Sequence, residues 1–204
     1  MSGASRQART SPGAPFQKGR GVEEIPYIVD DQKLHWYALK VFYNRITFLK
    51  SLREMEGIES YVPMHTVEEY GNGRLKYEEK QLIPSLMFVH CTQKWLTAFK
   101  RQYPDYFMYY TAPESRDPGI ISDSEMRSFI LVTSADAGRR AQYFGADAPE
   151  YHTGDHVRVT DGIYKGAEGY IKRIKKDRKL IVSVTGVAVV AVSYIHPSFL
   201  EKID

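Results

Sequence analysis

Residues 154–171 constrain the fold of this chain more than any other segment. They read G-D-H-V-R-V-T-D-G-I-Y-K-G-A-E-G-Y-I. The glycines at 162, 166 and 169 mark tight backbone turns that larger side chains would forbid. Val157 and Val159 alternate with polar residues, as in a half-buried strand. The segment therefore predicts two short strands joined by a glycine-punctuated loop.

The bulk composition is that of a globular protein. A chain of 204 residues has room for one large or two small domains, each with its own core. The net charge is only +3, which excludes a polycation that coats nucleic acid along its whole length. Basic residues nevertheless gather at the ends, since the first 20 residues hold Arg6, Arg9, Lys18 and Arg20 and no acid.

The cysteine content and hydropathy point to the cytoplasm. Cys91 is the only cysteine, which excludes an internal disulfide and suits a reducing compartment. No apolar run reaches the roughly 18 residues needed to cross a bilayer, and residues 1–33 contain no hydrophobic run like the core of a signal peptide. We therefore expect a cytoplasmic protein without a membrane partner.

The chain divides into four parts. Residues 1–33 are rich in Gly, Ser, Pro and Arg and predict a disordered basic tail. Residues 34–135 predict an α+β domain, an antiparallel sheet with flanking helices. Residues 136–150 lose all periodicity and predict a flexible linker, and 151–204 predict a small β-barrel.

Within the second part, turn and capping signals locate the elements. A Gly-Asn-Gly turn at 71–73 predicts a hairpin. Ser122 and Glu125 have the spacing of a capping box at a helix start. The expected elements, in order, are a strand at 35–42, a helix from about 44 to 57, strands at 60–70, 75–83 and 85–90, a helix at 95–101, a strand at 106–110 and a helix after 122.

Three segments, in this order, resemble the NusG family of transcription elongation factors. They are Trp36-Tyr37-Ala38-Leu39, the stretch Leu82-Ile83-Pro84-Ser85-Leu86-Met87-Phe88-Val89, and the glycine-punctuated segment, which is similar to a KOW motif. The resemblance covers residues 34–204. It implies a NusG-type N-terminal domain followed by a KOW domain, which is an SH3-like barrel. It also implies a regulator that is not an enzyme, needs no cofactor and acts as a monomer.

The resemblance also implies partners. The N-terminal domain of the family docks an apolar concavity on the clamp helices of the RNA polymerase largest subunit and suppresses pausing. The KOW domain recruits a second partner, which can be Rho, a ribosomal protein or a Nus factor. By strand alternation, Leu86 and Phe88 share one sheet face and Lys40 lies on the same face as Trp36. The polymerase-binding candidates are Ile83, Leu86, Phe88, Tyr110 and Lys40, and a place in the core is the alternative for each.

Nucleic-acid contacts are expected at two places. Asn44 and Arg45 lie at the start of the first helix, where specialised family members touch the non-template DNA strand, and an ordinary helix cap and a surface cation are the alternatives. A second candidate is the basic hairpin with Lys172, Arg173, Lys175 and Lys176, for which simple solvation is the alternative. Tyr164, in the glycine loop, is the candidate KOW partner contact, and barrel packing is its alternative.

The sequence departs from the family pattern at two points. Ser85 and Leu86 replace the usual glycine and tyrosine, and 187–192 is entirely apolar where a mixed polar strand is usual. The first change keeps the contact apolar but can alter polymerase selectivity. The second argues against Rho binding and favours a specialised paralogue that antiterminates long operons, such as those for surface polysaccharides. The competing hypothesis is a ribosome-associated RNA-binding protein that uses the barrel and the basic hairpin. His152 and His156 form no metal site, because Gly154 between them breaks a helix and no third ligand is near.

Overall fold

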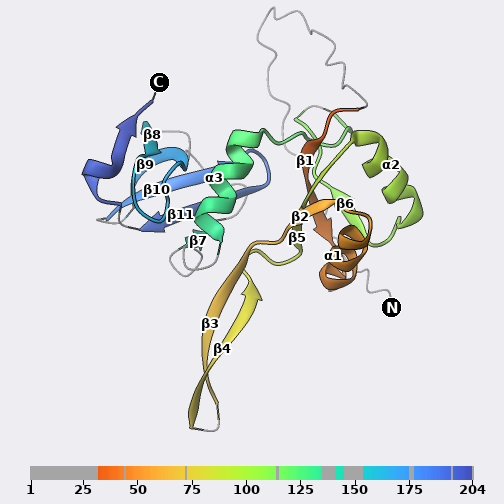
Figure 1. The fold of residues 1–204 in the computed structure, drawn as a ribbon, viewed down its shortest axis with the longest axis horizontal. Coiled ribbons are helices and arrows are strands. Elements are labelled where there is room, and N and C mark those ends of the chain that lie inside the picture. The colour runs from red at the N-terminus through yellow and green to blue at the C-terminus, as the bar shows by residue number, and fades with distance from the viewer. Residues whose placement is uncertain are drawn as a thin grey trace, which may run out of the picture.

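The structure is a computed structural model that describes residues 32–43, 45–71, 73–113, 115–134, 141–144, 154–174, 177–193 and 195–203 (Figure 1). Its helices are α1 (Ile46–Met55), α2 (Gln93–Gln102), α3 (Asp123–Thr133) and the 3-10 helix η1 (Pro197–Phe199). Its strands are β1 (His35–Val41), β2 (Glu59–Tyr61), β3 (Met64–Gly71), β4 (Arg74–Gln81), β5 (Leu86–Cys91), β6 (Phe107–Tyr109), β7 (Ala141–Tyr143), β8 (Asp155–Val159), β9 (Glu168–Ile174), β10 (Asp177–Val184), β11 (Ala188–Ser193) and β12 (Leu200–Lys202).

The N-terminal half is an antiparallel sheet in the order β2-β5-β1-β6. One face carries Leu39, Met87 and Val89 and packs with residues of α1 and α2. The other face carries Leu86 and Phe88 and packs with residues of α3. The alternation predicted for β5 is therefore confirmed, and so is the α+β class.

The predicted hairpin is confirmed as a separate two-stranded sheet, β3-β4, which extends away from the rest of the molecule (Figure 1). Gly73 lies in its turn with a φ of 73°, a left-handed value that glycine adopts without steric cost. Sequence patterning merged β2 with β3, although residues 62–63 separate them. The long ribbon therefore begins only after the chain has left the N-terminal sheet.

The C-terminal half is a six-stranded antiparallel sheet in the order β12-β8-β9-β10-β11-β7. Gly169 allows the close approach of β10, because a Cβ at this position would lie 2.3 Å from the backbone oxygen of Ile181. Strand β7 falls inside the segment predicted to be a linker and pairs with β11. Short polar strands of this kind have little periodicity, so the sequence signal missed it.

Helix α3 lies between the two sheets (Figure 1). Ser122 and Glu125 form the predicted capping box at its start. One continuous apolar cluster runs from Phe88 of the N-terminal sheet, through Phe129 of α3, to Val182 of β10. The core of the molecule therefore joins the two halves instead of ending at the boundary between them.

Candidate functional site: the apolar face beneath helix α3

Three of the five polymerase-binding candidates are buried. The exposed fractions of Ile83, Leu86 and Phe88 are 4%, 1% and 0%. The Phe88 ring lies 5.3 Å, centroid to centroid, from that of Phe129 in α3. In this arrangement, α3 occupies the sheet face on which a partner was expected to dock.

The other two candidates lie nearer the surface. Lys40 is exposed on β1 and pairs in register with Met108 of β6. Tyr110 is half-buried, and its pKa is raised by burial and by the nearby hydroxyl of Tyr143 on β7. Tyr110 thus belongs to the N-terminal half, and both it and Tyr143 pack against the same apolar cluster.

Two sides of α3 make different contacts. Toward the N-terminal sheet, Phe129 contacts Phe88, and the Thr133 hydroxyl lies 2.7 Å from the Tyr61 hydroxyl. Toward the C-terminal sheet, the contacts include hydrogen bonds. The Ser128 hydroxyl oxygen accepts one from the backbone N–H of Glu168 at 3.0 Å.

Glu125 makes the second polar link to the C-terminal sheet. Its Oε1 accepts a hydrogen bond from the Thr185 hydroxyl at 2.8 Å, while its Oε2 caps α3 by accepting one from the Ser122 hydroxyl at 2.8 Å. Burial raises the pKa of Glu125, but the hydrogen bonds from Ser122 and Thr185 outweigh it and hold the pKa below the ordinary value of 4.5. The carboxylate form therefore stabilises this joint.

Ser85 occupies a backbone position that favours glycine. Its φ is 65°, and its carbonyl oxygen accepts a hydrogen bond from the Val41 N–H at 2.8 Å, which ties the start of β5 to the end of β1. Its own N–H donates to Gln81 Oε1 at 3.1 Å. The sequence has serine at this position, where the family usually has glycine. A φ of 65° is sterically unfavourable for serine but not for glycine.

The nucleic-acid candidate before α1 is partly described. Asn44 lies outside the described residues. Arg45 stacks its guanidinium 3.9 Å from the centre of the Tyr106 ring and 5.4 Å from that of Tyr43. Tyr43 is 83% exposed and has a φ of 56°, a rare value for a residue with a side chain. Sequence analysis missed Tyr43, since nothing local predicts a left-handed tyrosine.

The second nucleic-acid candidate does not form one patch in the described part of the chain. Lys172 pairs with Lys179, and Arg173 pairs with Arg178, across β9 and β10. Neighbouring residues of a strand point to opposite faces, so these cations divide between two faces of the sheet. Lys179 also donates a hydrogen bond to a β7 side chain. Lys175 and Lys176 lie outside the described residues.

Tyr164 is only 4% exposed and packs in the core of the C-terminal half, and its neighbour Ile163 is 57% exposed. Ile163, not Tyr164, is therefore the side chain that the glycine loop presents.

Among the described residues no cluster of three His, Cys, Asp or Glu side chains could hold a metal ion. His156 instead stacks on Tyr170, with ring centres 4.7 Å apart. In the same residues, no helix has the length and apolar character to span a bilayer.

The apolar run at 187–192 is explained by packing. Strand β11 lies between β10 and β7, and both of its faces are buried. Val190 and Val192 belong to the large cluster, whereas Val189 and Ala191 pack with Ile181 on the other face. A strand buried on both faces has no polar alternation, so this run gives no information about a partner.

Comparison with known proteins identifies the class of the N-terminal half. Residues 34–130, which hold the sheet and most of α3, match the family described as transcription termination factor nusG. Residues 34–130 therefore form a domain of the NusG family, a family of transcription factors. A solved structure described as "Domain interaction in Thermotoga maritima NusG" is similar, with a TM-score of 0.43 and 23% identity over 84% of this chain and 98% of that one. No curated protein matches the chain.

Proposed function

We propose that this chain regulates transcription elongation by binding the clamp helices of the RNA polymerase largest subunit, where it suppresses pausing and termination. The docking half consists of the N-terminal sheet and α3. The C-terminal half is a KOW domain of the SH3-like barrel type, which recruits a ribosomal protein, Rho or a Nus factor. One observation carries the proposal: the C-terminal sheet covers an apolar cluster at α3.

Docking requires the C-terminal sheet to separate from α3. The contact between them contains the hydrogen bonds of Glu125 and Ser128, and water can replace these bonds when the joint opens. The contact between α3 and the N-terminal sheet is apolar around Phe88 and Phe129. Interfaces between domains that move are more polar than a permanent core. The joint at the C-terminal sheet also contains apolar side chains such as Val182, and in this proposal it is the joint that opens.

Antitermination by a specialised family member is the finer form of this proposal. Its support is Ser85, which stands where the family usually has glycine and adopts a φ of 65°. Arg45, stacked between Tyr43 and Tyr106, offers a cation and an exposed ring to the non-template strand. The described basic residues of β9 and β10 divide between two faces, which disfavours the ribosomal alternative.

A reversible disulfide across the joint tests the proposal. The Ser128 hydroxyl lies 3.0 Å from the Glu168 backbone nitrogen, so the two Cα atoms are near enough for a disulfide. The double variant Ser128→Cys, Glu168→Cys would be compared in its oxidised and reduced forms for binding to core RNA polymerase. The native Cys91 does not interfere, because it is buried and its pKa is raised to about 12.

We expect the reduced protein to bind polymerase and the oxidised protein to bind far more weakly. Each single cysteine variant is the matched control and should bind equally in both redox states. Equal binding by both forms of the double variant would mean that polymerase docks elsewhere. Failure of the wild-type chain to bind would reject the polymerase proposal itself.

A further inference from the structure

A cavity of about 680 Å³ lies beside the start of α3, and we call it the α3 cavity. Its walls are formed by the start of β1, the start of α2, the loop at 112–121 and the first turn of α3. Pockets that hold small molecules have volumes of roughly 300–1,000 Å³, so this one has room for a small organic ligand. The described residues that line it all lie between Lys33 and Glu125. The cavity therefore belongs to the N-terminal half, and separation of the C-terminal sheet from α3 leaves its walls intact.

Part of the cavity wall is apolar. Pro118 and Ile121 are buried and Ile120 is half-buried, whereas Leu34, which also lines the cavity, is 51% exposed. A ligand with an apolar body would cover Leu34 and gain the free energy of removing its surface from water. The cavity therefore suits a molecule that is apolar over part of its surface.

The charged groups of the wall are mostly acidic. Asp117, Asp123 and Glu125 contribute carboxylates, and Lys33 is the one lysine or arginine among the described lining residues. Like charges repel, so the cavity disfavours phosphates and other anions. An ammonium or guanidinium group is attracted instead, and it can donate hydrogen bonds to the carboxylate oxygens. The wall therefore selects a cation.

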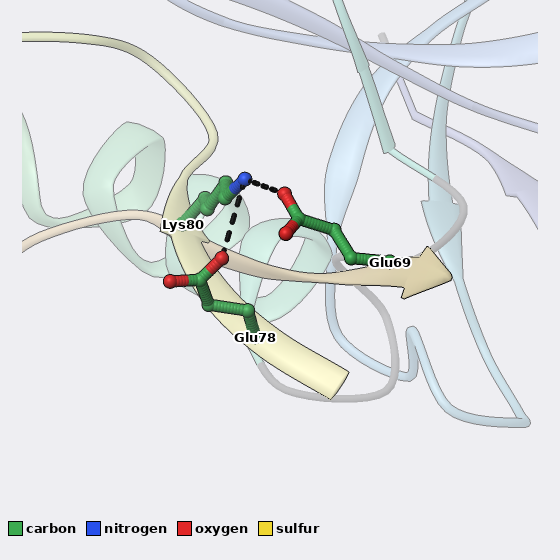
Figure 2. A network of polar contacts seen from close by, with 3 residues as sticks. All are labelled: Glu69, Glu78 and Lys80. Atoms are coloured by element: carbon green, nitrogen blue, oxygen red, sulfur yellow. Dashed lines mark hydrogen bonds and ion pairs between the residues drawn. The ribbon is translucent and has the colours of Figure 1, made fainter. Parts of the chain in front are cut away.

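The three carboxylates of the α3 cavity form no ion pair with the described residues. Asp117 and Glu125 accept hydrogen bonds from serine and threonine hydroxyls, which are neutral. The β3-β4 hairpin differs, because Figure 2 shows Lys80 bonded to Glu69 on the facing strand and 3.3 Å from Glu78 on its own strand. The α3 cavity therefore holds negative charge that no ion pair in the described chain compensates.

Glu125 connects the cavity to the joint between α3 and the C-terminal sheet. In the closed form its Oε1 accepts a hydrogen bond from the Thr185 hydroxyl at 2.8 Å. Separation of the C-terminal sheet removes Thr185 and leaves Oε1 free to accept a bond from a cation in the cavity. Such a cation therefore binds the separated form more tightly than the closed form. A ligand with this preference shifts the equilibrium toward the separated form.

We propose that the α3 cavity binds a small organic cation with an apolar body, and that this ligand releases the joint between α3 and the C-terminal sheet. This inference rests on the proposed function, because that joint has to open before polymerase can dock. The ligand competes with Thr185 for one oxygen of Glu125. Loss of one such bond changes an equilibrium constant about fivefold, so saturating ligand should favour the separated form about fivefold.

The first test measures binding to the full-length chain, without polymerase, by NMR titration of its backbone amides. The probes are phenethylamine, which is a cation at neutral pH, and phenethyl alcohol, which has the same ring and chain but no charge. We expect the amine to bind about tenfold more tightly than the alcohol and to shift amide signals in 112–125. The variant Asp117→Asn, Asp123→Asn should lose this preference. The matched control Glu79→Gln, which neutralises an exposed acid on the β3-β4 hairpin, should keep it.

The second test measures the ratio of separated to closed forms by single-molecule energy transfer, with dyes on cysteines that replace the exposed Lys50 and Lys165. Saturating phenethylamine should raise this ratio about fivefold, and phenethyl alcohol should leave it unchanged. In Thr185→Val the competing hydroxyl is absent. The amine should therefore bind this variant up to about fivefold more tightly than the wild type and shift its ratio less.

Equal binding of the amine and the alcohol, or full amine binding by the variant Asp117→Asn, Asp123→Asn, would overturn the inference. Amine binding that leaves the ratio of the two forms unchanged would also overturn it. Neither experiment contains polymerase, so these outcomes do not bear on the proposed function. That proposal fails separately, if the wild-type chain does not bind polymerase.

Discussion

The joint between α3 and the C-terminal sheet can be weakened without touching its apolar contacts. Thr185→Val removes the hydroxyl that donates to Glu125 at 2.8 Å, and Ser128→Ala removes the acceptor of the Glu168 N–H at 3.0 Å. Thr185 is exposed and Glu125 only half-buried, so the first bond contributes at the low end, about 1 kcal/mol. Ser128 is 3% exposed and its neutral bond contributes about 1 kcal/mol as well.

The double variant should therefore shift the equilibrium between closed and separated forms by about 2 kcal/mol, or roughly thirtyfold. Single-molecule energy transfer measures this ratio directly, with dyes on cysteines introduced at the exposed positions Lys50 and Lys165. Buried Cys91 would stay unlabelled. Thr185→Ser keeps the donating hydroxyl and is the matched control for the first change.

The ratio of closed to separated forms, measured by the same energy-transfer assay, should also depend on pH. In the closed form burial raises the pKa of Glu125, but the hydrogen bonds from Ser122 and Thr185 hold it below 4.5, and separation would remove the bonds from Thr185. Because the pKa of Glu125 is lowered in the closed form, its carboxylate stabilises that form at pH values above 4.5, the ordinary pKa. This stabilisation is lost as the pH falls through the pKa that Glu125 has in the closed form. Acidification should increase the separated fraction, and less so in Thr185→Val. A closed fraction that neither the double variant nor acid alters, in a protein that stays folded, would show that apolar packing alone holds the joint.

Two further changes test stability, both by thermal and denaturant unfolding. Ser85→Gly should raise the free energy of unfolding by up to about 1 kcal/mol, because a φ of 65° costs glycine less than serine; a lower melting temperature would contradict this. Arg53 is 0% exposed, 3.7 Å from the Phe99 ring centre and ion-paired with Glu56 at 3.3 Å. Arg53→Ala should cost about 3 kcal/mol and Arg53→Met about 1 kcal/mol, since methionine fills the space without a buried charge; equal costs would show that the charge itself is required.

Local signals predicted the local structure. Alternation in 86–89 placed Leu86 and Phe88 on one face of β5, and the spacing of Ser122 and Glu125 located the start of α3. Both predictions depend on residues within one strand or one helical turn. The second bond of Glu125, to Thr185, joins residues 60 apart and has no local signal. Sequence analysis therefore identified the sheet face but could not predict what covers it.

The apolar run at 187–192 also shows that local sequence signals do not reveal contacts with distant segments. Its lack of polar residues suggested a changed partner, but the buried environment of β11 depends on β7, which adds a strand beyond it. Residues 141–143 gave no strand signal by themselves. Where burial is created by a distant segment, a sequence can indicate an apolar strand without indicating why it is apolar.

Helix α3 contacts both sheets, and one apolar cluster runs through both contacts. Phe129 and Thr133 contact the N-terminal sheet, whereas Glu125 and Ser128 form hydrogen bonds with the C-terminal sheet. Separation from the C-terminal sheet would expose Val182 and its apolar neighbours together with polar groups that water can satisfy, and separation from the N-terminal sheet would expose Phe88 and its neighbours. In the opening that we propose, α3 stays on the N-terminal sheet. Leu86 and Phe88 would then act from beneath the helix, by holding it in place, and the half-buried Tyr110, which packs against the same cluster as Tyr143, would become more accessible to a partner.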